Sequence, residues 1–254
     1  MTFSTSSSPS SIPAKSFALI VPTLNEGDNI GLLLDSVQSA LESVSNPYTI
    51  IVVDDGSTDA TREIVRNCSR NDSRIKLVAR DGEKGLAGAI LHGWANSDAE
   101  LLGVIDADLQ HPPDLLPSML AAAADADDVD IVIASRYAKE DGVRGWNPVR
   151  ALISRLSTFA TRPLLRNHLG VTDPMAGFFI VRRECIDGLT FQTKGFKLLL
   201  EILVRGKIRS AREVPYRFGL RHAGKSKAGA GVAVQYVFLL GRLSWDTVIR
   251  SGAR

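Results

Sequence analysis

The 254-residue sequence has a formal net charge of +2 and 44% hydrophobic residues, a composition typical of a soluble globular protein with one large domain or two small ones. The charges are unevenly spread: residues 98–130 contain acids but no Lys or Arg, whereas residues 142–170 and 205–227 are strongly basic. This pattern predicts a metal-binding pole and an anion-binding pole. No zinc-finger, RNA-recognition or homeodomain pattern is found, which argues against nucleic acid as a partner. Cys68 and Cys185 fit no zinc or redox spacing and are expected to be core thiols in a reducing compartment.

The chain begins with a Ser-rich segment, residues 1–16, which lacks the apolar stretch of a secretory signal, so we expect a disordered tail. From Phe17 onward, short apolar runs alternate with segments of helical periodicity. This alternation predicts an α/β fold in which an open sheet carries helices on both faces. The expected strands are Phe17–Val21, Tyr48–Val53, Ile75–Ala79, a run that begins at Leu101, Val129–Ala134, Ala176–Val181 and Val214–Phe218.

The strand that begins at Leu101 is followed by Asp106, Asp108 and Gln110. In an extended chain, residues two apart point to the same face, so these side chains are expected to converge where the strand ends. Their oxygen atoms suit Mg²⁺ or Mn²⁺, which usually keep other positions for water and phosphate. The alternative is a strand-end turn with solvated Asp side chains. His111 is interpreted first as structural, and its closeness to the metal residues keeps a ligand role as the alternative.

Polar residues also follow other predicted strands. Asn25 and Asp54 come after the first two strands, and Arg136 comes after the fifth. In open α/β sheets, ligands bind outside the carboxyl ends of the strands. We therefore expect these residues and Asp106 to line one crevice, although strand–turn–helix junctions with capping acids would produce a similar sequence.

The end of the chain combines a basic loop, residues 220–227, with a predicted amphipathic helix, Val232–Ile249. Polar residues interrupt this segment too often for it to span a bilayer. The helix is expected either to pack on the domain or to lie in a membrane surface.

Seven motifs that occur in order along the chain resemble those of a known family. They are Pro22–Glu26, Asp54–Asp59, Lys84–Leu86, Asp106–His111, Ser135–Tyr137, Ala176–Phe178 and Gly224–Lys227. With these motifs the sequence is similar to family 2 glycosyltransferases of the dolichyl-phosphate mannosyltransferase, or polyprenyl-phosphate glycosyltransferase, type. The resemblance implies a GT-A fold with an open mixed sheet over residues 17–227 and a C-terminal amphipathic helix within residues 228–254. It also implies a nucleotide-sugar donor and Mg²⁺ or Mn²⁺ as cofactor.

The same resemblance implies roles for individual residues. The donor is bound by Pro22, Thr23, Asn25, Glu26, Asp54, Asp106, Arg221 and Lys225. The metal ligands are Asp106, Asp108 and Gln110, and the acceptor phosphate is held by Arg136, Arg150 and Ser154. The catalytic groups are Asp106, Asp108 and Arg221.

The expected reaction transfers a hexose, foremost mannose from GDP-mannose, to a polyprenyl or dolichyl phosphate with inversion of configuration. A phosphate acceptor is already largely a dianion at neutral pH, so no general base is needed. Asp173 is a candidate base, and a loop-capping role is equally compatible with the sequence. The alternatives are a soluble glycosyltransferase that acts on a sugar hydroxyl and a non-catalytic subunit that binds a nucleotide-sugar.

The resemblance has two departures. Leu24 stands where the family often has Tyr, and many relatives continue into transmembrane helices that this sequence lacks. The expected location is therefore the cytoplasmic face of a membrane, bound peripherally. We expect either a truncated form or a form that needs a membrane-anchoring partner.

Overall fold

A computed structural model describes residues 14–80, 84–124, 129–138, 157–165, 169–192, 197–219 and Gly241. The predicted phosphate and loop residues Arg150, Ser154, Arg221 and Lys225 lie outside these ranges, as do residues 1–13 of the predicted tail and all of the predicted C-terminal helix except Gly241. Ser16, at the end of the predicted tail, is held in place: its N–H donates to Glu100 over 3.1 Å, and its carbonyl accepts from the Leu101 N–H over 2.9 Å.

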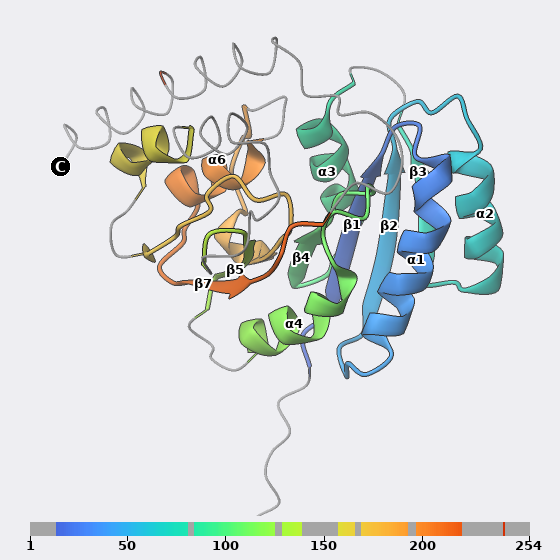
Figure 1. The fold of residues 1–254 in the computed structure, drawn as a ribbon, viewed down its shortest axis with the longest axis horizontal. Coiled ribbons are helices and arrows are strands. Elements are labelled where there is room, and N and C mark those ends of the chain that lie inside the picture. Colours follow the sequence, from blue (N-terminus) through green and yellow to red (C-terminus); the bar gives the residue numbers. More distant parts are fainter. Residues whose placement is uncertain are drawn as a thin grey trace, which may run out of the picture.

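The described residues form a seven-stranded mixed sheet with the order β3-β2-β1-β4-β6-β5-β7 (Figure 1). Strands β1 to β4 are parallel to one another, β6 runs antiparallel between β4 and β5, and β7 is parallel to β5. The strands are β1 Phe17–Thr23, β2 Tyr48–Asp54, β3 Ile75–Ala79, β4 Leu101–Val104, β5 Ile131–Ser135, β6 Phe179–Arg182 and β7 Ala211–Pro215. The expected open mixed sheet is thus confirmed.

Helices cover both faces of the sheet, as predicted. The α-helices are α1 Gly27–Leu41, α2 Thr61–Asn71, α3 Leu86–Ala95, α4 Leu116–Ala124 and α6 Leu198–Arg205, and the short 3₁₀ helices are η1 Pro113–Leu115, η2 Arg162–Leu164 and η4 Arg183–Cys185. Residues 157–161 are also helical.

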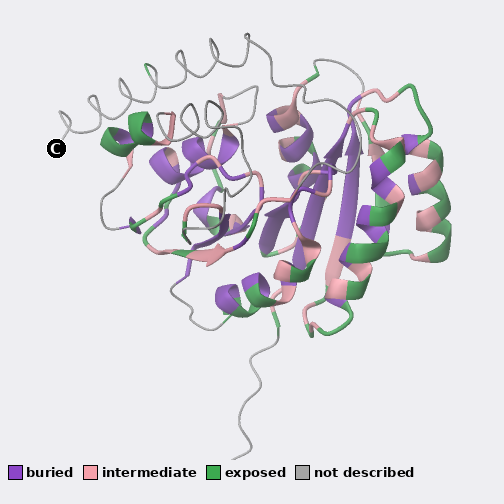
Figure 2. Cartoon of the chain, viewed as in Figure 1, coloured by how far each residue is buried: buried purple, intermediate pink, exposed green. Residues whose placement is uncertain are grey.

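Strand β1 shows why the sheet has two apolar faces. Successive side chains of a strand point to opposite sides. Phe17, Leu19 and Val21 accordingly pack with α1, α2 and α4, whereas Ala18 and Ile20 pack with α3 and α6. Every residue of β1 is buried, as expected for a central strand covered on both faces (Figure 2).

Two expected boundaries are wrong, and both affect the site. Strand β7 spans Ala211–Pro215 rather than Val214–Phe218, because the Asp130 carboxylate accepts the N–H groups of Arg209 and Ser210 and thereby fixes where pairing with β5 begins. Strand β4 ends at Val104. The following residues turn, with Leu109 in the left-handed region at φ 60°, so the alternation of side chains expected of an extended chain does not apply there.

Candidate active site

The loops after β1 and β2 are joined to each other by Asn25. Its backbone N–H donates to the Ser57 hydroxyl, and its side-chain carbonyl accepts from the Thr58 N–H, each over 2.8 Å. Asn25 has a φ of 54°, a left-handed conformation that Asn adopts more readily than most residues. Asn25 therefore fixes the relative position of two loops that the sequence predicts to bind the donor.

The other predicted donor residues near Asn25 differ in exposure. Pro22 and Thr23 are buried, and the Thr23 hydroxyl donates to the Val53 carbonyl over 3.3 Å. Glu26 is partly exposed; its N–H donates to the Thr61 hydroxyl, and its carboxylate accepts from the Asn29 amide over 2.8 Å. Pro22 and Thr23 thus support the loop from within, while Asn25 and Glu26 lie at its surface.

The Asp54 carboxylate is fully buried beneath the second loop. Its Oδ2 accepts from the N–H groups of Gly56 and Ser57 over 3.1 and 3.0 Å and from the Arg62 guanidinium. Burial opposes ionisation of Asp54, but the hydrogen bonds from Ser57 and Arg62 outweigh burial and lower its pKa. Among the described residues, its Oδ1 has no hydrogen-bond partner. Asp54 is therefore an ionised support of the loop in this structure.

Two acids that sequence reasoning did not assign individually also hold the donor loops. Asp55 accepts from the Arg80 guanidinium over 2.8 Å and from the Gly85 N–H over 2.6 Å. Asp59 accepts the N–H groups of Gly27 and Thr61 over 2.9 and 3.0 Å and so links the beginnings of α1 and α2. The sequence signal was available in the Asp54–Asp59 motif, but it did not show which acid bonds to which N–H.

A lysine of the third loop also approaches the second loop. The Lys84 ammonium is so close to Gly56 that a Cβ added there would lie 3.0 Å from Nζ. Gly56 has a φ of +90°, a conformation that glycine adopts without strain. This brings a cation to the loops that are predicted to hold the nucleoside of the donor.

The predicted metal residues follow β4 as a turn. The Asp106 side chain is 33% exposed, whereas Asp108 and Gln110 are buried. One Asp108 oxygen accepts the Gln110 N–H over 3.1 Å. The Gln110 amide donates to the Gly219 carbonyl over 3.1 Å, and the Gly219 N–H donates back to the Gln110 carbonyl over 2.9 Å. Gln110 therefore ties the turn to the segment that follows β7.

The donor set of this turn fits a partially protein-bound divalent cation. No group of three or more His, Cys, Asp or Glu side chains within the described ranges is arranged to hold a metal, so the residues do not form a complete cage. Mg²⁺ is usually bound through one or two carboxylates and completed by phosphate oxygens and water. Asp106 and Asp108 can supply those carboxylates, and hard oxygen donors match Mg²⁺ or Mn²⁺.

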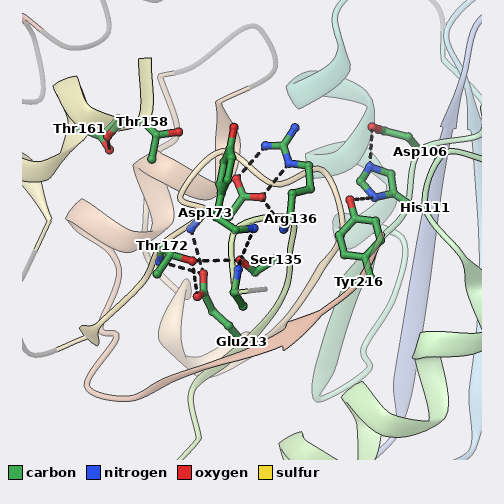
Figure 3. A network of polar contacts seen from close by, with 12 residues as sticks. Asp106, His111, Ser135, Arg136, Thr158, Thr161, Thr172, Asp173, Glu213 and Tyr216 are labelled. Atoms are coloured by element: carbon green, nitrogen blue, oxygen red, sulfur yellow. Dashed lines mark hydrogen bonds and ion pairs between the residues drawn. The ribbon is translucent and has the colours of Figure 1, made fainter. Parts of the chain in front are cut away.

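The predicted phosphate ligand Arg136 forms a bidentate ion pair with Asp173 (Figure 3). Its Nε and Nη2 donate to the two Asp173 oxygens, each over 2.7 Å. Burial opposes the charge on Arg136, but the hydrogen-bonded Asp173 outweighs burial and raises its pKa. Asp173 is fully buried and also accepts the Arg136 N–H over 3.1 Å. Of the two roles compatible with the sequence, the structure therefore supports the loop anchor rather than the general base.

Glu213 of β7 supports the Arg136–Asp173 pair by binding the backbone beside Asp173. The sequence analysis assigned Glu213 no role. One of its oxygens accepts the N–H groups of Thr172 and Asp173, each over 2.9 Å, and the other accepts the Thr172 hydroxyl over 2.6 Å. The Thr172 hydroxyl also contacts the Ser135 hydroxyl at 3.1 Å (Figure 3). The sequence signal that could have indicated a role for Glu213 is its position as the one acid in the basic segment 205–227.

Two more features lie near Arg136. Burial and the Arg136 charge lower the pKa of Lys197 to about 8, although the Asp173 charge opposes this shift. A groove of about 550 Å³ begins at Tyr137 and Thr172, beside the ion pair, and most of its side chains are apolar. It is lined by Tyr137, Thr158, Phe159, Arg162, Leu165, Val171, Thr172 and Pro174.

The metal turn and the Arg136 cluster meet at Tyr216. Burial raises the pKa of the Tyr216 hydroxyl; the Arg136 charge lowers it, and the charges of Asp173, Asp106 and Asp108 raise it. All of these groups therefore lie within electrostatic range of one side chain. Asp106 and Arg136 thus lie near one side chain, while Asn25 and Asp54 lie at the neighbouring strand ends of the same sheet edge. That all four line one crevice stays a prediction.

Comparisons with known proteins agree with this arrangement. The family described as Glycosyl transferase family 2 matches residues 18–189. A dolichol-phosphate mannosyltransferase of Pyrococcus furiosus is 36% identical over 90% of this chain and 64% of its own length. Those of Mycosarcoma maydis and Saccharomyces cerevisiae are 32% and 30% identical, over 92% and 87% of this chain and 79% and 84% of their own lengths. The chain thus spans less than two thirds of the Pyrococcus relative.

Solved structures show the same fold. Glucosyl-3-phosphoglycerate synthase from Mycobacterium tuberculosis, in complex with Mn²⁺, uridine-diphosphate and glucosyl-3-phosphoglycerate, has a TM-score of 0.67 at 22% identity, covering 91% of this chain and 80% of that chain. The same enzyme in complex with Mg²⁺ and uridine-diphosphate gives the same values. Because the family match covers residues 18–189, more than half of the sequence, the chain belongs to glycosyl transferase family 2.

Proposed function

We propose that this glycosyltransferase transfers mannose from GDP-mannose to a dolichyl or polyprenyl phosphate, with inversion at the anomeric carbon. The observation that carries the proposal is the largely apolar groove that begins at Tyr137 and Thr172, next in the chain to the Arg136–Asp173 pair. A lipid phosphate has the complementary chemistry, with an anionic head and an apolar chain. Similarity to dolichol-phosphate mannosyltransferases over 87–92% of this chain supports the same acceptor and sugar.

Arg136 is the described residue best suited to hold the acceptor phosphate. A guanidinium presents a rigid fork of donors that matches phosphate oxygens. Asp173 fixes its orientation through two hydrogen bonds of 2.7 Å, and Lys197 adds a second cation nearby. Arg150 and Ser154 complete this site in the proposal, on the strength of the sequence resemblance.

The donor is assigned to the loops after β1, β2 and β4. Asn25 and Glu26 lie at the surface of the first loop, and Asp54 supports the second. Asp106 and Asp108 would hold Mg²⁺ or Mn²⁺, with Gln110 as a further ligand or as the residue that ties their turn to Gly219. A bound divalent cation would neutralise charge on the departing diphosphate. Lys84, together with Arg221 and Lys225 from the resemblance, would add positive charge for the same diphosphate.

The acceptor oxygen needs no general base in this scheme. A phosphate monoester is largely a dianion at neutral pH, because its second pKa is about 6, whereas a sugar hydroxyl would have to lose a proton during attack. Asp173, the candidate base, is buried and accepts three hydrogen bonds from Arg136. This arrangement favours a phosphate acceptor over the alternative of a sugar hydroxyl.

The acceptor implies contact with a membrane surface. No helix in the described part of the chain is both long and apolar enough to cross a bilayer. We therefore propose peripheral binding at the cytoplasmic face, through the basic loop 220–227 and the predicted helix that follows it. A membrane-anchoring subunit is the proposed partner if these segments do not suffice.

A panel of nucleotide-sugars tests the proposal, with dolichyl phosphate in detergent, a short water-soluble isoprenyl phosphate and free sugars as acceptors. We expect mannosyl transfer from GDP-mannose to both phosphates in the presence of Mn²⁺ and none after treatment with EDTA. Transfer to free sugars but not to phosphates would overturn the acceptor assignment. Transfer of another sugar to dolichyl phosphate would overturn the donor assignment alone.

A further inference from the structure

His111 lies directly behind the Asp106 carboxylate, and no step of the proposed reaction uses it. Its ring is 3% exposed. Nε2 is 3.5 Å from the Asp106 Oδ2, and Nδ1 is 2.7 Å from the hydroxyl oxygen of Tyr216 (Figure 3). The three side chains form a chain of contacts that begins just after β7 and ends at a proposed metal ligand.

We propose that Tyr216, acting through His111, is a positioning residue that orients Asp106 for binding the divalent cation. This inference rests on the proposed function, because it assumes that Asp106 is a metal ligand. Partners that hydrogen-bond to metal-ligating groups orient those groups, and their loss typically weakens metal binding. Tyr216 and His111 are 105 positions apart in the sequence, and the sequence alone therefore assigned His111 no partner.

The surroundings leave the His111 ring little freedom to rotate. The edges of Phe178 and Phe218 pack against it, with ring centroids 5.8 and 5.3 Å away. Gly177 faces the same carboxylate oxygen: a Cβ added there would come within 2.6 Å of the Asp106 Oδ2 and 3.3 Å of the His111 Nε2. The carboxylate thus lies against an imidazole and a backbone segment, while one third of the Asp106 side chain remains exposed.

The hydrogen-bond donors of the three groups can be assigned by elimination. An ionised carboxylate only accepts hydrogen bonds, so in the neutral ring the nitrogen that faces Asp106 carries the hydrogen. Nδ1 is then the acceptor, and the Tyr216 hydroxyl donates to it. Burial raises the pKa of this hydroxyl, which keeps it protonated and able to donate. The tyrosine therefore selects the tautomer that directs an N–H toward Asp106.

Tyr216 is itself held by the neighbouring strand. Its backbone N–H donates to the Ser135 carbonyl over 3.2 Å, one residue before Arg136. The segment after β7 thus contacts both the acceptor side, through Ser135, and the metal turn, through His111 and through the Gly219–Gln110 pair. Because Tyr216 is anchored in this way, its hydroxyl can hold the His111 ring, and the ring can hold the Asp106 carboxylate, in one orientation.

The test measures Mn²⁺ affinity in the presence of saturating GDP by electron paramagnetic resonance, using the full-length chain. In Tyr216→Phe the ring is kept and only the hydroxyl is lost, so we expect Mn²⁺ to bind about tenfold more weakly, at the lower end of the effect typical of such partners. GDP binding without metal should be unchanged. Tyr48→Phe is the matched control, because the Tyr48 hydroxyl is also buried but has no hydrogen-bond partner among the described residues.

A double variant tests whether Tyr216 acts through His111. Since coupled residues are not additive, Tyr216→Phe should add nothing once His111→Phe has removed both ring nitrogens. Mn²⁺ affinity of Tyr216→Phe equal to that of the wild type, or an equal loss in Tyr48→Phe, would overturn the positioning role, and so would additive losses in the double variant. Failure of the wild type to bind Mn²⁺ with GDP would instead overturn the metal-dependent function itself, and the positioning role with it.

Discussion

The two sides of the site are held together over very different distances along the chain. Contacts within and between the loops after β1 and β2 join residues at most 35 positions apart, as in Asp54–Arg62 and Glu26–Thr61. Arg136 pairs with Asp173 over 37 positions, and in the metal turn His111 and Gln110 bond to partners 105 and 109 positions away. The loops after β1 and β2, proposed to bind the donor, are thus nearly local units, whereas the metal turn depends on segments that meet only in the complete fold.

The difference follows from the topology of the sheet. Strands β1 to β3 are adjacent, parallel and separated by single helices, so consecutive loops meet at one edge. Strand β6 is inserted antiparallel between β4 and β5, which brings the loop before it to the end of β5. Polar groups around Arg136 therefore come from segments that are remote in sequence, such as Asp173 before β6 and Glu213 in β7.

The largest effect is expected where the two sides meet, at the metal turn. Asp108→Asn keeps an oxygen that can accept the Gln110 N–H but removes the negative charge proposed to bind the cation. Loss of metal assistance should lower kcat on the order of 1000-fold, since such assistance provides several kcal/mol. Steady-state kinetics with saturating donor and acceptor measure this change. A variant that unfolds in urea like the wild type and retains full activity would remove Asp108 from the metal site.

The second prediction compares two Arg–Asp ion pairs, one buried and one more exposed to solvent. Asp173→Ala leaves Arg136 buried without its partner and should cost about 3–5 kcal/mol in the free energy of unfolding. Asp72→Ala removes the carboxylate from a pair in which the Arg74 and Asp72 side chains are 49% and 13% exposed. It also loses the bond from the Gln38 amide, so it should cost about 1–2 kcal/mol. Urea unfolding of both variants measures the difference. Equal costs would contradict the view that the acceptor side depends on its buried pair.

The same contrast explains what the sequence could predict. Alternating apolar and polar segments identified the strands, the helices on both faces and the polar ends of β1, β2, β4 and β5. The sequence placed the motif Asp106–Gln110 after β4 but predicted an extended chain there instead of a turn. The turn has a positive φ at Leu109, and Gln110 bonds to Gly219, which lies 109 positions away in the sequence. Glu213 and Lys197 were missed for the same reason: neither stands in a motif, and their importance arises only when β7 and α6 pack beside Arg136.

The third prediction concerns the pH dependence of the acceptor side. Because burial and Arg136 lower the folded-state pKa of Lys197 to about 8, the unfolded chain binds more protons above that pH, and the free energy of unfolding should rise between about pH 8 and 10. Over the same range the lysine loses its charge, and KM for the lipid phosphate should rise about tenfold, as expected when one charged hydrogen bond is lost. Lys197→Met should abolish both trends. If KM rises equally in that variant, another group is responsible.

The smallest effect is expected at Asn25, where the donor loops meet through neutral hydrogen bonds. Asn25→Gly accepts the left-handed φ of 54° without strain but loses the bond to the Thr58 N–H. A neutral hydrogen bond contributes about 1 kcal/mol, so KM for the donor should rise about fivefold while KM for the acceptor stays constant. Asn25→Ala loses the same bond and adds backbone strain. Compared with Asn25→Gly, it should have a lower free energy of unfolding and a higher KM for the donor. Because the contact joins two loops only 33 positions apart, neither variant should alter the Arg136–Asp173 side, and a change in acceptor KM would show that the two sides of the site are coupled after all.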